Sequence, residues 1–164
     1  MEYLKPYIGK VISKITRLDH CIEDYDVHRA CGLFLQFVNE ANGIQIITDN
    51  FGDEILCSII SFEIFSKQKL DGYGNLTHLK DLDPLISVIN QKLESIHLGY
   101  CNAADVLGNG FTIQQVQLQV IVFEFENKEL SIANSGDEIW IEVTYDNTSK
   151  IHNWPNMEWK KIYN

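Results

Sequence analysis

Two pairs of adjacent carboxylates are the residues of this sequence best suited to chemistry. They occur in NFGDEILCSI at residues 50–59 and in NSGDEIWIEV at residues 134–143. Asp53 and Glu54 form the first pair, and Asp137 and Glu138 form the second. Carboxylates that converge in one cleft bind hard metal ions or act as a general acid and base. A small-ligand or metal-dependent enzyme is therefore one hypothesis for this chain.

The same residues also describe a tight turn that leads into a strand. Gly52 and Gly136 can adopt the positive φ that tight turns need, and Asn50 and Asn134 are favourable openers of a turn. Adjacent residues of a strand point to opposite faces of its sheet. Both acids of a pair can enter one pocket only if the turn still bends there, so the turn interpretation is favoured.

A second candidate is the acidic segment from Asp19 to Cys31, which contains two histidines and two cysteines. Imidazole and thiolate groups bind zinc, but their spacing here matches none of the usual zinc motifs. A surface loop is favoured, and loops often contact partners. We expect partner contacts from the acids of this loop, its tyrosine and the acids of both turns: Asp19, Glu23, Asp24, Tyr25, Asp26, Asp53, Glu54, Asp137 and Glu138.

No other arrangement in the sequence is typical of a catalytic centre. His78, His97 and His152 are far apart in the chain, without a nucleophile motif beside them. The glycine-rich runs at 71–75 and 108–110 lack the residues that complete a phosphate-binding loop. We therefore expect no enzyme activity, no cofactor and no metal ion.

The recurrence of Asn-x-Gly-Asp-Glu-Ile belongs to a longer internal similarity. LFLQF at 33–37 precedes the first copy, and IVFEF at 121–125 precedes the second. A repeat of this kind defines the structural unit of a fold. The chain is predicted to be a single domain, 1–164, with two similar halves related by a pseudo-two-fold axis. The halves span 1–64 and 79–146, the connection spans 65–78, and the C-terminal tail spans 147–164.

Alternating apolar and polar residues predict that each half is a three-stranded meander. In the first half the strands are expected at about 31–38, 44–49 and 53–61. In the second half the alternation changes face near Val120, which predicts a bulge there. The tail is expected to pack across the sheet or close one of its edges.

Helices are expected at two places. Asp83-Pro84 opens a predicted helix over about 84–95, with Asp83 as its N-cap. Pro6 and Gly9 restrict the N-terminal helix to a turn or two. The sequence therefore predicts an α+β fold that is mainly antiparallel β, with about eight strands and one principal helix.

The charge of the chain narrows the classes of partner. It has 23 acidic residues against 13 basic ones, a net charge of −10, whereas nucleic-acid binding needs clustered lysine and arginine. An acidic surface can steer a basic protein towards it. We recognise neither a signal peptide nor an apolar segment that could span a membrane. The four cysteines show no C-x-x-C spacing, so a cytoplasmic protein with free cysteines is expected.

The stretches LFLQF…NFGDEI and IVFEF…NSGDEI, together with size and charge, give the chain a loose family resemblance. It resembles small acidic cytoplasmic proteins of bacterial toxin-immunity systems and neighbouring uncharacterised families. The resemblance implies a non-enzymatic protein that binds and blocks a basic toxin through an acidic surface, and it carries over no individual functional residue. A self-associating structural or adaptor protein is a further alternative, and the oligomeric state is open.

Overall fold

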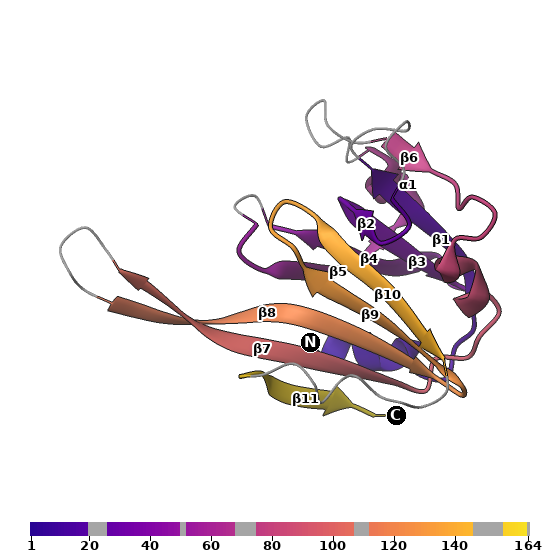
Figure 1. Ribbon diagram of the computed structural model, residues 1–164. Helices are drawn as coiled ribbons and strands as arrows, with labels where there is room; N and C mark the ends of the chain where they lie inside the picture. Colours follow the sequence, from indigo (N-terminus) through magenta and orange to yellow (C-terminus); the bar gives the residue numbers. More distant parts are fainter. Residues whose placement is uncertain (20–25, 50–51, 68–74, 107–111, 146–155, 164) are drawn as a thin grey trace.

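The predicted strands form two antiparallel sheets in the computed structural model (Figure 1). The structure describes residues 1–19, 26–49, 52–67, 75–106, 112–145 and 156–163. Strands far outnumber helices in these residues, which confirms the predicted α+β fold that is mainly antiparallel β. The described part contains eleven strands, more than the eight expected.

The first sheet has five strands in the order β5-β4-β3-β1-β6. Its members are β1 (Ile12–Asp19), β3 (Gly32–Phe37), β4 (Asn42–Thr48), β5 (Ile55–Ser61) and β6 (Asn75–Thr77). The three strands predicted in the first half of the chain are therefore present, as β3, β4 and β5.

The second sheet has six strands in the order β11-β7-β8-β9-β10-β2. Its members are β2 (Arg29–Ala30), β7 (Ser95–Val106), β8 (Thr112–Phe125), β9 (Lys128–Asn134), β10 (Ile139–Tyr145) and β11 (Glu158–Ile162). β2 comes from the first half of the chain and pairs with β10 at the edge, so the two halves are interleaved there.

The two sheets share one arrangement. The strands β1, β3, β4 and β5 follow one another as antiparallel neighbours, and so do β7, β8, β9 and β10. Each sheet thus contains the same four-stranded meander. The origin of this arrangement in an internal duplication stays a prediction.

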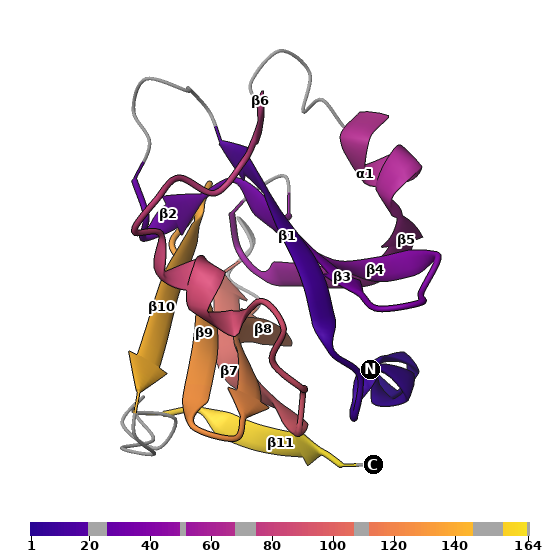
Figure 2. The ribbon, with the colours of Figure 1, turned by 90° about the vertical axis from the view of Figure 1, so that its right-hand side faces the viewer.

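One continuous hydrophobic core lies between the two sheets. It combines Ile15, Leu35 and Ile46 of the first sheet with Ile121 and Ile132 of the second. The alternate residues of the strands supply these side chains because successive residues point to opposite faces. Figure 2 shows the sheets at an angle, with the 3-10 helix η2 (Pro84–Val88) beside β9 and β10.

The helix predicted over 84–95 is wrong in type and extent. Asp83 caps η2 through its side chain, which accepts a hydrogen bond from the amide of Leu85, but the helix ends at Val88. Ile89 is extended and Asn90 has a φ of 66°, which breaks the helical path. Leu85 and Val88 are buried from the helix, whereas Leu93 is buried from the extended segment that follows. The spacing of the apolar residues therefore identified buried positions, but these positions do not belong to one continuous helix.

Two further helices are short. The 3-10 helix η1 (Glu2–Tyr7) fulfils the prediction of a turn or two at the N-terminus. The α-helix α1 (Phe62–Lys67) follows β5 directly, where the sequence suggested the end of the first unit and the beginning of a connection. Its Phe65 packs with Phe34 on the side of the first sheet that faces away from the main core.

The predicted bulge and the predicted role of the tail are confirmed. Gly99 pairs with Val120 and Tyr100 pairs with Leu118, so Gln119 is the extra residue of the bulge. β11 in the tail pairs with β7 and closes that edge over residues 96–100. The ring of Trp159 lies over Gly99, at 3.0 Å from the position that a Cβ atom would take there.

Candidate functional site

Both Asp-Glu pairs follow tight turns, as the glycines predict. In the first turn the side chain of Asp49 accepts hydrogen bonds from the amides of Asp53, at 2.6 Å, and Glu54, at 3.2 Å. Gly52 has a φ of 71°, and residues 50 and 51 lie outside the described part of the chain. A side-chain oxygen that caps two amides fixes the direction in which the following strand begins.

The second turn uses an asparagine in the same role. The Oδ1 atom of Asn134 accepts a hydrogen bond from the amide of Gly136 at 3.0 Å, and Gly136 has a φ of 80°. The amide of Ser135 donates to the carbonyl of Glu138 at 2.9 Å. The described hydrogen bonds of the two turns thus come from the backbone and from the side chains of Asp49 and Asn134.

The two turns touch each other across the boundary between the sheets. A Cβ atom at Gly52 would lie 2.7 Å from the carbonyl carbon of Gly136. The Nδ2 atom of Asn134 donates to the carbonyl of Gly52 at 3.0 Å, and the Nε2 atom of Gln119 donates to the carbonyl of Asp53 at 2.6 Å. Segments 84 residues apart therefore form one surface feature. We call this feature, Gly52–Glu54 with Asn134–Glu138, the paired turn.

The four acids of the paired turn differ in exposure. Asp53 and Asp137 are exposed, whereas Glu54 and Glu138 are half-buried. The Oε2 atom of Glu138 lies 3.8 Å from the Nη1 atom of Arg29. Within the described ranges, no group of three or more His, Cys, Asp or Glu side chains is arranged to hold a metal ion. The backbones of the two turns meet, and the carboxylates exposed beside this contact are those of Asp53 and Asp137.

An aromatic and basic cluster lies beside the paired turn, formed by Trp140 of β10, Arg29 of β2 and His28 immediately before β2. The rings of Trp140 and His28 stack at 5.3 Å with an interplanar angle of 11°, and the guanidinium of Arg29 lies 5.8 Å from the ring of Trp140. The side chain of Trp140 faces outward, and the residue is 37% exposed. Ile139 and Ile141 of β10 point into the core. Trp140 lies between them in the strand and therefore points to the opposite face.

The predicted acidic loop is only partly described. Glu23, Asp24 and Tyr25 lie outside the described residues. Asp26 is exposed, and its side chain accepts a hydrogen bond from the amide of His28 at 2.8 Å. Asp19 is 5% exposed, so its carboxylate lies beneath the surface.

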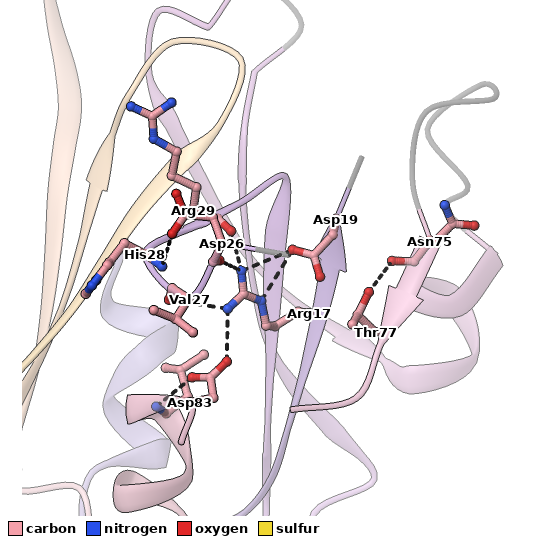
Figure 3. Close-up of polar contacts among 10 residues, drawn as sticks. Arg17, Asp19, Asp26, Val27, His28, Arg29, Asn75, Thr77 and Asp83 are labelled. Atoms are coloured by element: carbon pink, nitrogen blue, oxygen red, sulfur yellow. Dashed lines mark hydrogen bonds and ion pairs between the residues drawn. The ribbon is translucent and has the colours of Figure 1, made fainter. Parts of the chain in front are cut away.

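Asp19 belongs to a buried network around Arg17 (Figure 3). The Arg17 side chain is fully buried and donates to Asp19 at 3.2 Å and to Asp83 at 3.0 Å. It also donates to the carbonyls of Asp26, Val27 and Arg29. A buried cation needs such complete pairing because desolvation of its charge is costly. The network ties β1 to the segment 26–29 and to the N-terminus of η2.

A second polar cluster was missed at the sequence level. On the outer side of β7, the Nε2 atom of His97 lies 3.2 Å from the Ser95 hydroxyl and 3.0 Å from Glu124, which also accepts from Ser95 and from Lys161. Burial raises the pKa of the Glu124 carboxyl, but hydrogen bonds from Lys161, Ser95 and His97 outweigh it and lower the pKa to about 2.

This cluster differs from a catalytic relay. In a relay the serine and the acid contact opposite nitrogens of the imidazole, whereas here both contact Nε2. Ser95 is also only 3% exposed. The i, i+2 spacing of Ser95 and His97 was the available signal, since such residues share one face of a strand. The cluster holds β11 against β7 through Lys161.

A pocket of about 520 Å³ lies between β5 and the β7–β8 hairpin. Tyr3, Leu56, Tyr100 and Val116 are among its lining residues. The Tyr3 hydroxyl donates to the carbonyl of Cys57 at 2.6 Å, and burial raises the pKa of Tyr3 to about 12. Burial likewise raises the pKa of the Cys57 thiol to about 12. The cysteine is therefore a neutral thiol at physiological pH, without the thiolate that nucleophilic chemistry requires.

Three cysteines of the described residues, Cys31, Cys57 and Cys101, are free. No helix in the described ranges is long and apolar enough to cross a membrane. Comparisons of the chain with models of protein families, with curated proteins and with solved structures find no match. Its function must therefore be argued from the geometry of the paired turn and its surroundings.

Proposed function

We propose that this protein is a non-enzymatic protein-binding module, and most concretely an immunity-type inhibitor that binds a basic toxin domain through the paired turn. The contact between Gly52 and Gly136 carries the proposal. It joins two acidic turns from distant parts of the chain into one surface with a fixed backbone. A fixed surface loses little conformational entropy when a partner binds.

The charge and accessibility of the acids support a basic partner. Asp53 and Asp137 are exposed, and among the described residues the side chains that hydrogen-bond within the turns are those of Asp49 and Asn134. Replacement of these side chains therefore leaves the turns intact. Exposed charges raise the rate of association with an oppositely charged protein and set its orientation.

Trp140 supplies the second element of an interface. Tryptophan and arginine are enriched among the residues that dominate binding energies. Trp140 stands two residues beyond Glu138, with His28 and Arg29 against its ring. Its orientation is thus held before any partner arrives. The proposed surface combines an aromatic anchor with an acidic rim.

The product of the gene adjacent to this one is the partner to test. This product, or a toxin domain within it, should be toxic when expressed alone, and co-expression of this protein should restore growth. The double variant Asp53→Lys/Asp137→Lys should bind the domain at least about tenfold more weakly in calorimetry. The control Glu126→Lys changes an exposed acid at the opposite end of β9 and should bind normally. An adjacent product that is harmless and does not bind would refute the toxin-immunity proposal.

A further inference from the structure

The β7–β8 hairpin extends beyond both of its neighbours in the sheet (Figure 1). The pairing of β11 with β7 stops at Tyr100, and the pairing of β9 with β8 stops at Val120. Beyond these points Cys101–Val106 pairs with Thr112–Gln117. No other strand of the described residues joins them there. We call this two-stranded part of the hairpin the arm.

The two edges of the arm differ in their surroundings. At the base of the arm, β8 lies close to β5, and Gln119 donates to the carbonyl of Asp53. The edge formed by β7 faces no described strand beyond Tyr100. A two-stranded ribbon is marginally stable by itself in water, and an open edge is a template for pairing with another chain. Among the described residues, the β7 edge beyond Tyr100 is therefore open to a further strand, and it is the edge that lies away from β5.

The composition of the arm indicates what that partner is. Between Leu98 and Phe123 the sequence has one charged residue, Asp105, although the chain has 23 acidic and 13 basic residues in all. The lysines and prolines that usually guard an open edge are missing from this stretch. Val116, on the other strand of the arm, is 63% exposed. The arm thus offers little charge to a basic partner and little repulsion to an identical arm.

We propose that the β7 edge of the arm pairs with the same edge of a second copy of this chain. Antiparallel pairing of Cys101–Val106 with itself gives a two-fold dimer in which the two arms form one four-stranded ribbon. Outside the arms, each copy keeps its net negative charge. The two copies therefore repel each other there, which opposes contact beyond the arms. The dimer uses residues other than the acids of the paired turn, so it is independent of the proposed inhibitor function.

Sedimentation velocity of the purified chain from about 1 to about 200 µM tests the proposal. Each copy has a mass of 18.9 kDa, and we expect the mass to double as the concentration rises. The variant Ala103→Glu/Ala104→Glu places like charges across the seam and should raise the dissociation constant at least about tenfold. The control Asn42→Glu/Asn127→Glu adds the same charge at exposed positions outside the arm and should dimerise nearly as well as the unchanged protein.

Hydrogen exchange on the unchanged protein gives a measurement that needs no variant. The amides of Cys101–Val106 should exchange more slowly at high protein concentration than at low concentration, whereas those of β4 should not respond. A strict monomer at all concentrations would overturn the proposal. A dimer that persists unchanged in Ala103→Glu/Ala104→Glu, with no concentration-dependent protection in the arm, would overturn it as well, because the seam would then lie elsewhere.

Discussion

The Arg17 network and the paired turn place acidic residues in opposite settings. Asp19 and Asp83 are 5% and 2% exposed and pair with a fully buried guanidinium. Asp53 and Asp137 are exposed, and the described hydrogen bonds around them run from backbone amides to the side chains of Asp49 and Asn134. Asp19 and Asp83, through Arg17, hold β1, the segment 26–29 and η2 together. Asp53 and Asp137 are available to another molecule. The same residue type therefore has a structural role in one place and a proposed binding role in the other.

The comparison predicts its largest effect at Arg17. Substitution Arg17→Met leaves Asp19 and Asp83 buried beside an apolar side chain, and it should lower the free energy of unfolding by about 3–5 kcal/mol. Urea denaturation followed by circular dichroism measures this loss. Arg29→Met removes an exposed guanidinium that lies 3.8 Å from Glu138 and should change stability by less than about 0.5 kcal/mol. Equal losses in the two variants would show that burial does not distinguish these arginines.

The contact within the paired turn predicts the next effect. Gly52 and Gly136 both have positive φ, but a Cβ atom at Gly52 meets the backbone of Gly136 at 2.7 Å, whereas one at Gly136 meets nothing within 4 Å. Gly136→Ala should therefore cost about 1 kcal/mol for its backbone conformation alone. Gly52→Ala should cost at least about 2 kcal/mol because the two turns must also separate. Thermal melting that gives equal costs would argue that the turns do not touch.

Glu124 is intermediate between the two settings, and its effect depends on pH. Its pKa is lowered to about 2 from 4.5, so its contribution to stability is present above about pH 4.5 and is lost as the pH falls towards 2. We expect that Glu124→Gln removes about 1 kcal/mol of this dependence, a value reduced for the partial exposure of the carboxylate. Urea denaturation of both proteins between pH 2 and about 6 measures the difference. Parallel stability curves would contradict the assignment.

The exposed acids of the paired turn predict the smallest effect on folding. Asp53→Asn and Asp137→Asn remove charge and leave the backbone hydrogen bonds of both turns in place. Each should change the free energy of unfolding by less than about 0.5 kcal/mol, as is usual for surface positions. A loss of more than about 1 kcal/mol in denaturation would place these carboxylates among the structural acids, as at Asp19.

Local patterns predicted much of the fold because they reflect local physics. Alternation located β3, β4 and β5, and the change of face near Val120 revealed the bulge at Gln119. Glycine at 52 and 136 identified both turns through its positive φ. The helix over 84–95 was predicted wrongly because the spacing of Leu85 and Val88 fits a short 3-10 helix as well as an α-helix.

The parts of the site that depend on distant contacts were beyond the sequence. Nothing local reveals that Asn134 reaches the carbonyl of Gly52, or that Trp140 lies on the outer face beside His28. Asp19 is buried in a network in which Arg17 pairs with both Asp19 and Asp83. Asp83 lies 64 residues from Asp19 in the chain. The acidic neighbours of Asp19 in the sequence gave no sign of that role. The residue types identified the chemical groups that the chain offers, whereas the tertiary structure determines which of these groups are accessible to a partner.

The central claim is that the acids of the paired turn bind a basic protein while the acids around Arg17 do not. It is tested most directly by the affinity of the adjacent gene's product for this protein and for Asp53→Lys/Asp137→Lys, at low and at physiological salt. We predict an affinity that weakens as salt rises and falls at least about tenfold in the double variant, with Glu126→Lys unchanged. Equal affinities for all three proteins at both salt concentrations would contradict the claim.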